Sequence, residues 1–75
     1  MASRGMMRLR LTQCQAFLFM DLGLHERIGV DPARSMLLTL RDCDTILRYT
    51  PRVGRTAMSL RRKISSMRWA VNHGK

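Results

Sequence analysis

The side chains with the clearest chemical meaning are the basic residues in the last third of the chain. Residues 45–75 contain eight Arg or Lys and no acid, whereas all five Asp and Glu lie between positions 21 and 44. A surface that serves only solubility mixes both signs, so an acid-free basic segment indicates a polyanionic partner. Arg outnumbers Lys twelve to two, and its planar guanidinium binds phosphate or a guanine edge through two hydrogen bonds.

This segment also has the spacing of an amphipathic helix over residues 56–71, with Thr56 as its N-cap and an apolar residue at every third or fourth position. The side opposite the apolar stripe is polar and basic. Such a helix fits the major groove of DNA, where Arg and Ser side chains bond to base edges or phosphates. The predicted contacts come from this polar side, its flanks and the preceding turn, and they are Arg52, Arg55, Thr56, Ser59, Arg61, Arg62, Lys63 and Ser66.

The beginning of the chain is basic as well. Arg4, Arg8 and Arg10 lie in a segment without apolar periodicity. We therefore expect residues 1–10 to be a flexible basic arm that follows the DNA backbone or minor groove. Residues 11–75 are expected to form a single helical domain.

Residues suited to catalysis or metal binding are sparse. Cys14, Cys43, His25 and His73 lack the C-x-x-C or H-x-x-x-H spacing of zinc sites. We find no Ser/His/Asp order, Gly-rich phosphate loop or paired carboxylates in an apolar setting. The prediction is a protein that is not an enzyme and has no cofactor, metal or small-molecule substrate.

Two cysteines are too few for a disulfide framework, so we expect a reduced, intracellular protein of the cytoplasm or nucleoid. A mitochondrial location is the alternative, because residues 1–20 are basic and acid-free, as presequences are.

The elements that would position the basic helix are also predicted to be helical. A chain of 75 residues that is 45% hydrophobic forms one small domain. Thr12 and Gln15 make a capping box at the start of a helix over about 12–24. Asp31-Pro32 predicts a second helix over 32–49, either continuous or broken at Thr39, where Thr39 and Asp42 would cap a separate helix. Nothing predicts a strand, so the expected fold class is all-α, a small three-helix or four-helix domain of helix-turn-helix type.

Residues 44–64 resemble the helix 2–turn–helix 3 unit of Myb/SANT-type and related phage or bacterial trihelical helix-turn-helix proteins. Gly54-Arg55-Thr56 matches the tripeptide that leads into their recognition helix. The small, polar and aliphatic positions that follow also match, and they are Ala57, Ser59, Leu60 and Ile64. The resemblance implies a set of DNA-facing residues, which are Arg55, Ser59, Arg62 and Lys63.

The leading hypothesis is a small DNA-binding regulatory protein, of phage or mobile-element type, that docks its last helix in the major groove of double-stranded DNA. A module this small has a limited interface, so we expect a homodimer or a protein partner, bound through the apolar Ala16–Leu24 region. Two alternatives remain open. One is an RNA-binding structural subunit of a ribosome-like particle, and the other is a small adaptor or inhibitor that binds a host protein through amphipathic helices.

Overall fold

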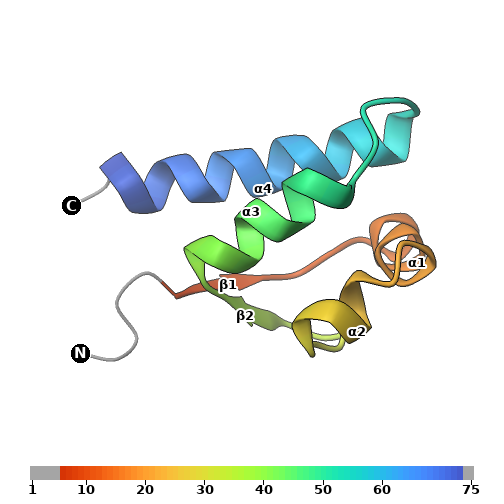
Figure 1. Ribbon diagram of the computed structural model, residues 1–75, viewed down its shortest axis with the longest axis horizontal. Coiled ribbons are helices and arrows are strands. Elements are labelled where there is room, and N and C mark those ends of the chain that lie inside the picture. Colours follow the sequence, from red (N-terminus) through yellow and green to blue (C-terminus); the bar gives the residue numbers. More distant parts are fainter. Residues whose placement is uncertain (1–5, 74–75) are drawn as a thin grey trace.

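The structure is a computed structural model that describes residues 6–73 (Figure 1). It is mostly helical, but it also contains a two-stranded antiparallel sheet, so the expectation of an all-α fold is corrected. The elements in chain order are β1 (Met7–Leu9), α1 (Gln13–Asp21), α2 (Leu24–Ile28), β2 (Met36–Leu38), α3 (Leu40–Tyr49) and α4 (Arg55–His73).

The sheet pairs a segment that was predicted to be an arm with one that was predicted to be helical. In β1 and β2, Met7 lies opposite Leu38 and Leu9 opposite Met36. These four side chains are buried, whereas Arg8 between them is exposed. The prediction of a flexible arm is therefore wrong for Met7–Leu9, because a run of three alternating residues is too short to identify a strand from periodicity. Arg4 lies outside the described residues.

Asp31 and Pro32 form a turn instead of the start of a helix. The Asp31 carboxylate accepts a hydrogen bond from the Ala33 amide at 3.0 Å, and the Asp31 carbonyl accepts one from the Arg34 amide at 3.1 Å. Asp stabilises tight turns and helix N-termini by the same local hydrogen bond, which explains why the prediction of a helix from residue 32 is wrong.

Two capping boxes begin α1 and α3, and both were predicted. The Thr12 hydroxyl accepts a hydrogen bond from the backbone N–H of Gln15. In return, the side-chain Oε1 of Gln15 accepts one from the backbone N–H of Thr12 at 3.0 Å. Thr39 and Asp42 make the same reciprocal pair, which confirms the alternative in which a separate helix begins after Thr39. The first predicted helix is shorter than expected, because α1 ends at Asp21 and Gly23, with φ of 74°, separates it from α2.

The longest helix, α4, contributes a continuous apolar side to the core. In Figure 1 it runs along the top of the molecule, with α3 crossing diagonally beside it. Leu60 and Ile64 are fully buried in one cluster with Phe19 of α1 and Ile46 of α3. The predicted apolar stripe of the last helix is therefore confirmed. Within residues 6–73, none of the helices combines the length and apolarity needed to cross a membrane.

The correction at β1 leads to a test with two neighbouring residues. We expect Leu9→Ala to lower the free energy of unfolding by about 2–4 kcal/mol, because it removes buried methyl groups from the core. Arg8→Ala should change it by less than about 0.5 kcal/mol, because the Arg8 side chain is exposed. Urea denaturation followed by circular dichroism measures both values. Equal, small effects of the two substitutions would show that β1 does not belong to the folded core.

Candidate nucleic-acid interface

One side of α4 is exposed along its whole length and carries no acid. Because the opposite side is buried in the core, the exposed residues recur every three or four positions. We call this set the exposed face of α4, and it consists of Arg55, Met58, Ser59, Arg62, Ser65, Ser66, Trp69, Ala70 and His73. Its formal charges are therefore all positive.

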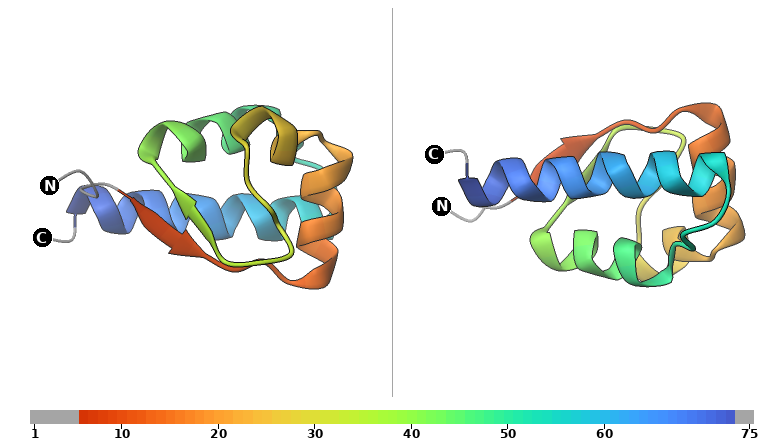
Figure 2. Two further views of the ribbon diagram at one scale, coloured as in Figure 1. Left: turned by 90° about the horizontal axis from the view of Figure 1, so that it is seen from below. Right: turned by 90° about the horizontal axis from the view of Figure 1, so that it is seen from above.

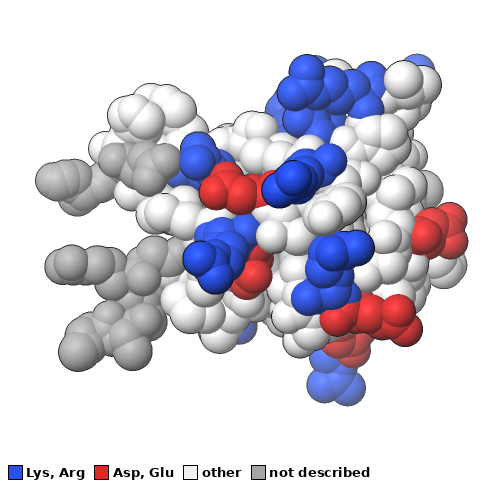
Figure 3. Space-filling model, viewed as in Figure 1, with Lys and Arg blue, Asp and Glu red and all other residues white. Residues whose placement is uncertain are grey.

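The charges near α3 are arranged differently. Arg68 of α4 pairs with Asp44 of α3, with 2.6 Å between Nε and Oδ1. Figure 3 shows acidic and basic side chains next to each other over α3, which gives that side of the molecule a mixed sign. Among the described residues, neither Arg55 nor Arg62 forms an ion pair. The positive charge of the exposed face of α4 is therefore not compensated by a neighbouring acid of residues 6–73.

A hydrogen-bond network ties this face to the N-terminal half of the chain. Gln15 of α1 is only 4% exposed. Its Nε2 donates to Ser59 Oγ at 2.9 Å, and its Oε1 accepts from Lys63 Nζ at 3.1 Å. Lys63 Nζ also donates to the Arg10 carbonyl at 3.1 Å. The network therefore places Arg10 beside α4, although the two lie more than fifty positions apart in the sequence.

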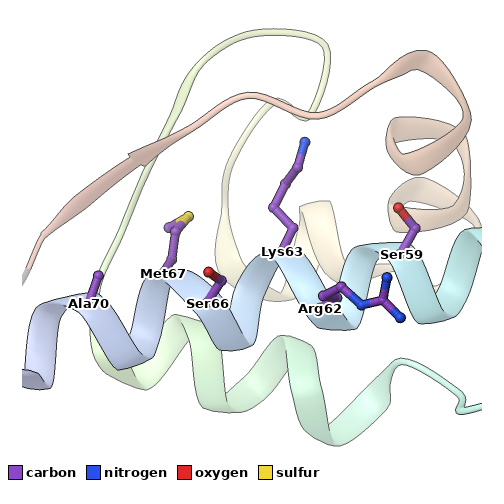
Figure 4. Close-up of a pocket in the computed structure, with 6 residues that line it drawn as sticks. All are labelled: Ser59, Arg62, Lys63, Ser66, Met67 and Ala70. Atoms are coloured by element: carbon purple, nitrogen blue, oxygen red, sulfur yellow. The ribbon is translucent and has the colours of Figure 1, made fainter.

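A shallow groove of about 530 Å³ runs along α4 next to this network. In Figure 4, Lys63 and Ser59 point toward the N-terminal segment, and Arg62 extends along the helix toward the end where Ser59 lies. The groove contains hydroxyl, ammonium and guanidinium groups but no carboxylate. Its lining residues are Ser59, Arg62, Lys63, Ser66, Met67 and Ala70.

Arg61, one of the predicted nucleic-acid contacts, forms hydrogen bonds within the fold. Its guanidinium donates to the carbonyl oxygens of Leu47 and Thr50, the latter at 2.7 Å. These carbonyls belong to the C-terminal end of α3, where backbone acceptors lack partners within the helix. Arg61 therefore connects the C-terminal end of α3 to α4.

The start of α4 differs from the prediction by one or two residues. The Gly54 carbonyl accepts from the Met58 amide at 3.0 Å, so Gly54, with φ of 99°, occupies the N-cap position that was predicted for Thr56. Thr56 is half-buried in the first turn. Arg52 is also exposed, which adds one cation just before Arg55, the first residue of the exposed face.

Arg8 is separated from the other predicted contact residues. It lies on the outer side of the sheet, since its neighbours Met7 and Leu9 point into the core. Figure 2 shows the sheet in front of α4 from below and α4 in front of the sheet from above. Among residues 6–73, no hydrogen bond or ion pair joins the Arg8 side chain to α4.

Gln15 is a polar residue of this site that the sequence analysis did not select. The T-x-x-Q motif identified its capping role, but its contacts with Ser59 and Lys63 span 44 and 48 positions. The alternation of apolar residues contains no signal for such a contact.

Comparisons with protein-family models, with curated proteins and with solved structures find no match to this chain. The resemblance to helix-turn-helix proteins therefore rests on residues 44–64 alone. Within residues 6–73, no three His, Cys, Asp or Glu side chains lie together in a way that could hold a metal ion.

The two cysteines lie in contrasting environments. Cys14 is exposed, whereas Cys43 is fully buried in the core. Burial raises the pKa of the Cys43 thiol from 9.0 to about 11, and the carboxylates of Asp42 and Asp44 act in the same direction, partly opposed by Arg68. Cys43 is accordingly a neutral core residue at physiological pH and a poor nucleophile.

This shift in the pKa of Cys43 predicts a loss of stability in alkali. Between pH 9 and about pH 11 the thiol ionises in the unfolded chain but stays protonated in the folded one, so the free energy of unfolding should fall across this range. In the Cys43→Ala variant, the free energy of unfolding should fall less over this pH range. In the Cys14→Ala variant, it should fall as much as in the wild type. Urea denaturation at several pH values provides the measurement, and identical slopes for all three proteins would contradict the assignment.

The role of Arg61 predicts a contrast with its neighbour. Arg61→Ala should lower the free energy of unfolding by about 1.5–3 kcal/mol, because two carbonyls at the end of α3 lose a charged donor. Arg62→Ala removes the same charge from an exposed position and should change stability by less than about 0.5 kcal/mol. Thermal and urea denaturation of both variants distinguish them. If Arg62→Ala destabilised the fold as much as Arg61→Ala, the division of roles between the two would be wrong.

Proposed function

We propose that this protein binds double-stranded DNA through the exposed face of α4 and acts as a small DNA-binding regulatory protein. The observation that carries the proposal is the acid-free exposed side of a 19-residue helix, with two arginines that have no ion-pair partner among residues 6–73. Arg55 and Arg62 are seven positions apart, which is about two helical turns, so both extend from the same side. Exposed guanidinium groups in such a row suit the phosphates and guanine edges of a duplex.

The arrangement of α3 and α4 supports docking of the helix-turn-helix kind. The two helices are in contact and are joined by the short connection of residues 50–54. In the families that residues 44–64 resemble, base contacts come mainly from the N-terminal part of the second helix. Arg55, Ser59 and Arg62 all lie within the first eight residues of α4. We accordingly assign α4 as the recognition helix.

A single copy of this domain offers a small interface, and we propose that it acts as a dimer or with a protein partner. Phe17 of α1 is 56% exposed. A groove of about 370 Å³ adjoins it, with Met20 of α1 and Pro32 of the following loop in its lining. This apolar surface includes part of the Ala16–Leu24 region and lies outside the exposed face of α4, so both can be occupied together.

One feature favours RNA as a second candidate partner. Trp69 is 62% exposed and stacks on His73, with 4.2 Å between the ring centroids. An exposed aromatic stack beside cationic residues is a platform on which unpaired bases can stack. Competition between a duplex and a single-stranded RNA of equal length separates the two candidates.

Salt dependence tests the proposed function directly. If α4 and its flanks neutralise about 4–6 phosphates, the logarithm of the duplex binding constant should fall against the logarithm of salt concentration with a slope of about −4 to −5. Fluorescence anisotropy with a labelled duplex, measured from low to moderate salt, gives this slope. A binding constant that does not change with salt would exclude phosphate contacts.

Charge-matched variants locate the interface. Arg55→Ala and Arg62→Ala should each weaken duplex binding by about 1–3 kcal/mol if the arginine contacts a base. If the arginine contacts only phosphate, the variant should bind all duplex sequences more weakly to the same extent, and the dependence of binding on salt should be less steep. Arg34→Ala removes the same charge from the loop before β2, where Arg34 pairs with Asp31, and should bind like the wild type apart from a small general charge effect. Equal losses for all three variants would mean that binding is not localised on α4.

A further inference from the structure

The ammonium group of Lys63 is held in place by neutral acceptors. It donates to the Arg10 carbonyl and to Gln15 Oε1, each at 3.1 Å. An ammonium group has three N–H donors, so one remains for another acceptor. No ion pair of Lys63 with an acid occurs within residues 6–73. The charge of Lys63 is thus fixed in position without being neutralised.

The hydroxyl of Ser59 also retains a hydrogen-bond donor, because Gln15 uses this hydroxyl as an acceptor. Its Oγ accepts a hydrogen bond from Gln15 Nε2 at 2.9 Å. A hydroxyl has one proton besides its lone pairs, and Gln15 already occupies one lone pair, so the proton of Ser59 is left to donate elsewhere. The Ser59 hydroxyl borders the groove that also contains the Lys63 ammonium and the Arg62 guanidinium.

The amide of Gln15 is what produces both effects. Either Glu or Gln at this position completes the capping box with Thr12. A glutamate would pair with Lys63 and cancel its charge, and it would accept the proton of Ser59 instead of donating to its oxygen. The side chain of Gln15 is only 4% exposed and completes the capping box of α1. It also leaves the Ser59 hydroxyl and the Lys63 ammonium of α4 each with a donor for a ligand.

We propose that Ser59, Arg62 and Lys63 form a binding site for one phosphate group, and that Gln15 is its positioning residue. Each of the three side chains offers at least one hydrogen-bond donor, which matches a phosphodiester whose oxygens only accept. This inference rests on the proposed function, in which the ligand is a phosphodiester of the DNA backbone. The site fixes the position of α4 on the duplex, because a phosphate contact sets register without reading sequence.

Gln15→Glu is the decisive variant, because it changes one amide to a carboxylate of the same shape. We expect the melting temperature to stay within error or rise, since the capping box persists and Lys63 gains an ion pair. Duplex affinity should fall about tenfold at 0.1 M salt, because one phosphate contact and its counterion release are lost. The slope of the logarithm of the binding constant against the logarithm of salt concentration should become shallower by about 1.

Gln13→Glu is the matched control, because it adds the same charge to an exposed position of the same helical turn. It should weaken binding by less than about twofold and leave the salt slope unchanged. Equal effects of Gln13→Glu and Gln15→Glu on affinity and slope would overturn the proposal, since the loss would then reflect overall charge.

A double-variant cycle tests whether Gln15 acts through Lys63. Lys63→Met should weaken duplex binding about tenfold, and Gln15→Glu added to Lys63→Met should weaken it by no more than Gln13→Glu does. A further tenfold loss in the double variant would show that Gln15 does not act on Lys63 and would overturn its positioning role.

The failure of this site can be distinguished from failure of the proposed function. Wild-type protein that does not bind duplex DNA overturns the proposed function. Titration with inorganic phosphate, followed by amide shifts of Ser59 and Lys63 in nuclear magnetic resonance spectra, then tests the site without nucleic acid. Shifts that saturate in the wild type and disappear in Gln15→Glu support the site, and equal shifts in both proteins overturn it.

Discussion

Burial of Leu60 and Ile64 in the core fixes the rotation of α4 about its own axis. Once these two side chains are enclosed by Phe19 and Ile46, the opposite side of the helix has to face solvent along its whole length. The positions of Arg55 and Arg62 follow from this constraint, because they lie on the far side of the helix from the buried pair. The apolar contacts that stabilise the domain therefore also orient the cations that we assign to DNA binding.

A second constraint comes from the end of α3, where Arg61 meets two backbone carbonyls. Adjacent arginines in the sequence thus have different roles, because Arg61 is directed toward α3 and Arg62 toward solvent. The difference of about 100° between consecutive residues is enough to separate a structural cation from an exposed one. Net charge alone does not distinguish them.

The sequence predicts those parts of the fold that depend on local signals. The apolar stripe of α4 spans several turns, and the Thr12–Gln15 and Thr39–Asp42 capping boxes each depend on residues three positions apart, so they were found. The sheet was missed because β1 and β2 have three residues each and are stabilised by pairing across nearly thirty positions. For the site, helical periodicity placed Arg55, Ser59 and Arg62 on one side. The contacts of Gln15, Lys63 and Arg10 depend on how α1 packs on α4, which no local pattern encodes.

The first turn of α4 contains no acid and begins with Arg55, although the partial positive charge of a helix N-terminus favours acidic residues there. A cation at this position costs about 0.3–1 kcal/mol of helix stability. Arg52, also exposed, adds a further charge of the same sign just before the helix. In a small domain with a net charge of +9, acids at these positions would have lowered repulsion as well. Residues that oppose local stability in this way are typical of functional sites. A phosphate bound near this end of α4 would neutralise the same charges, so the unfavourable electrostatics of the free protein become a contribution to binding.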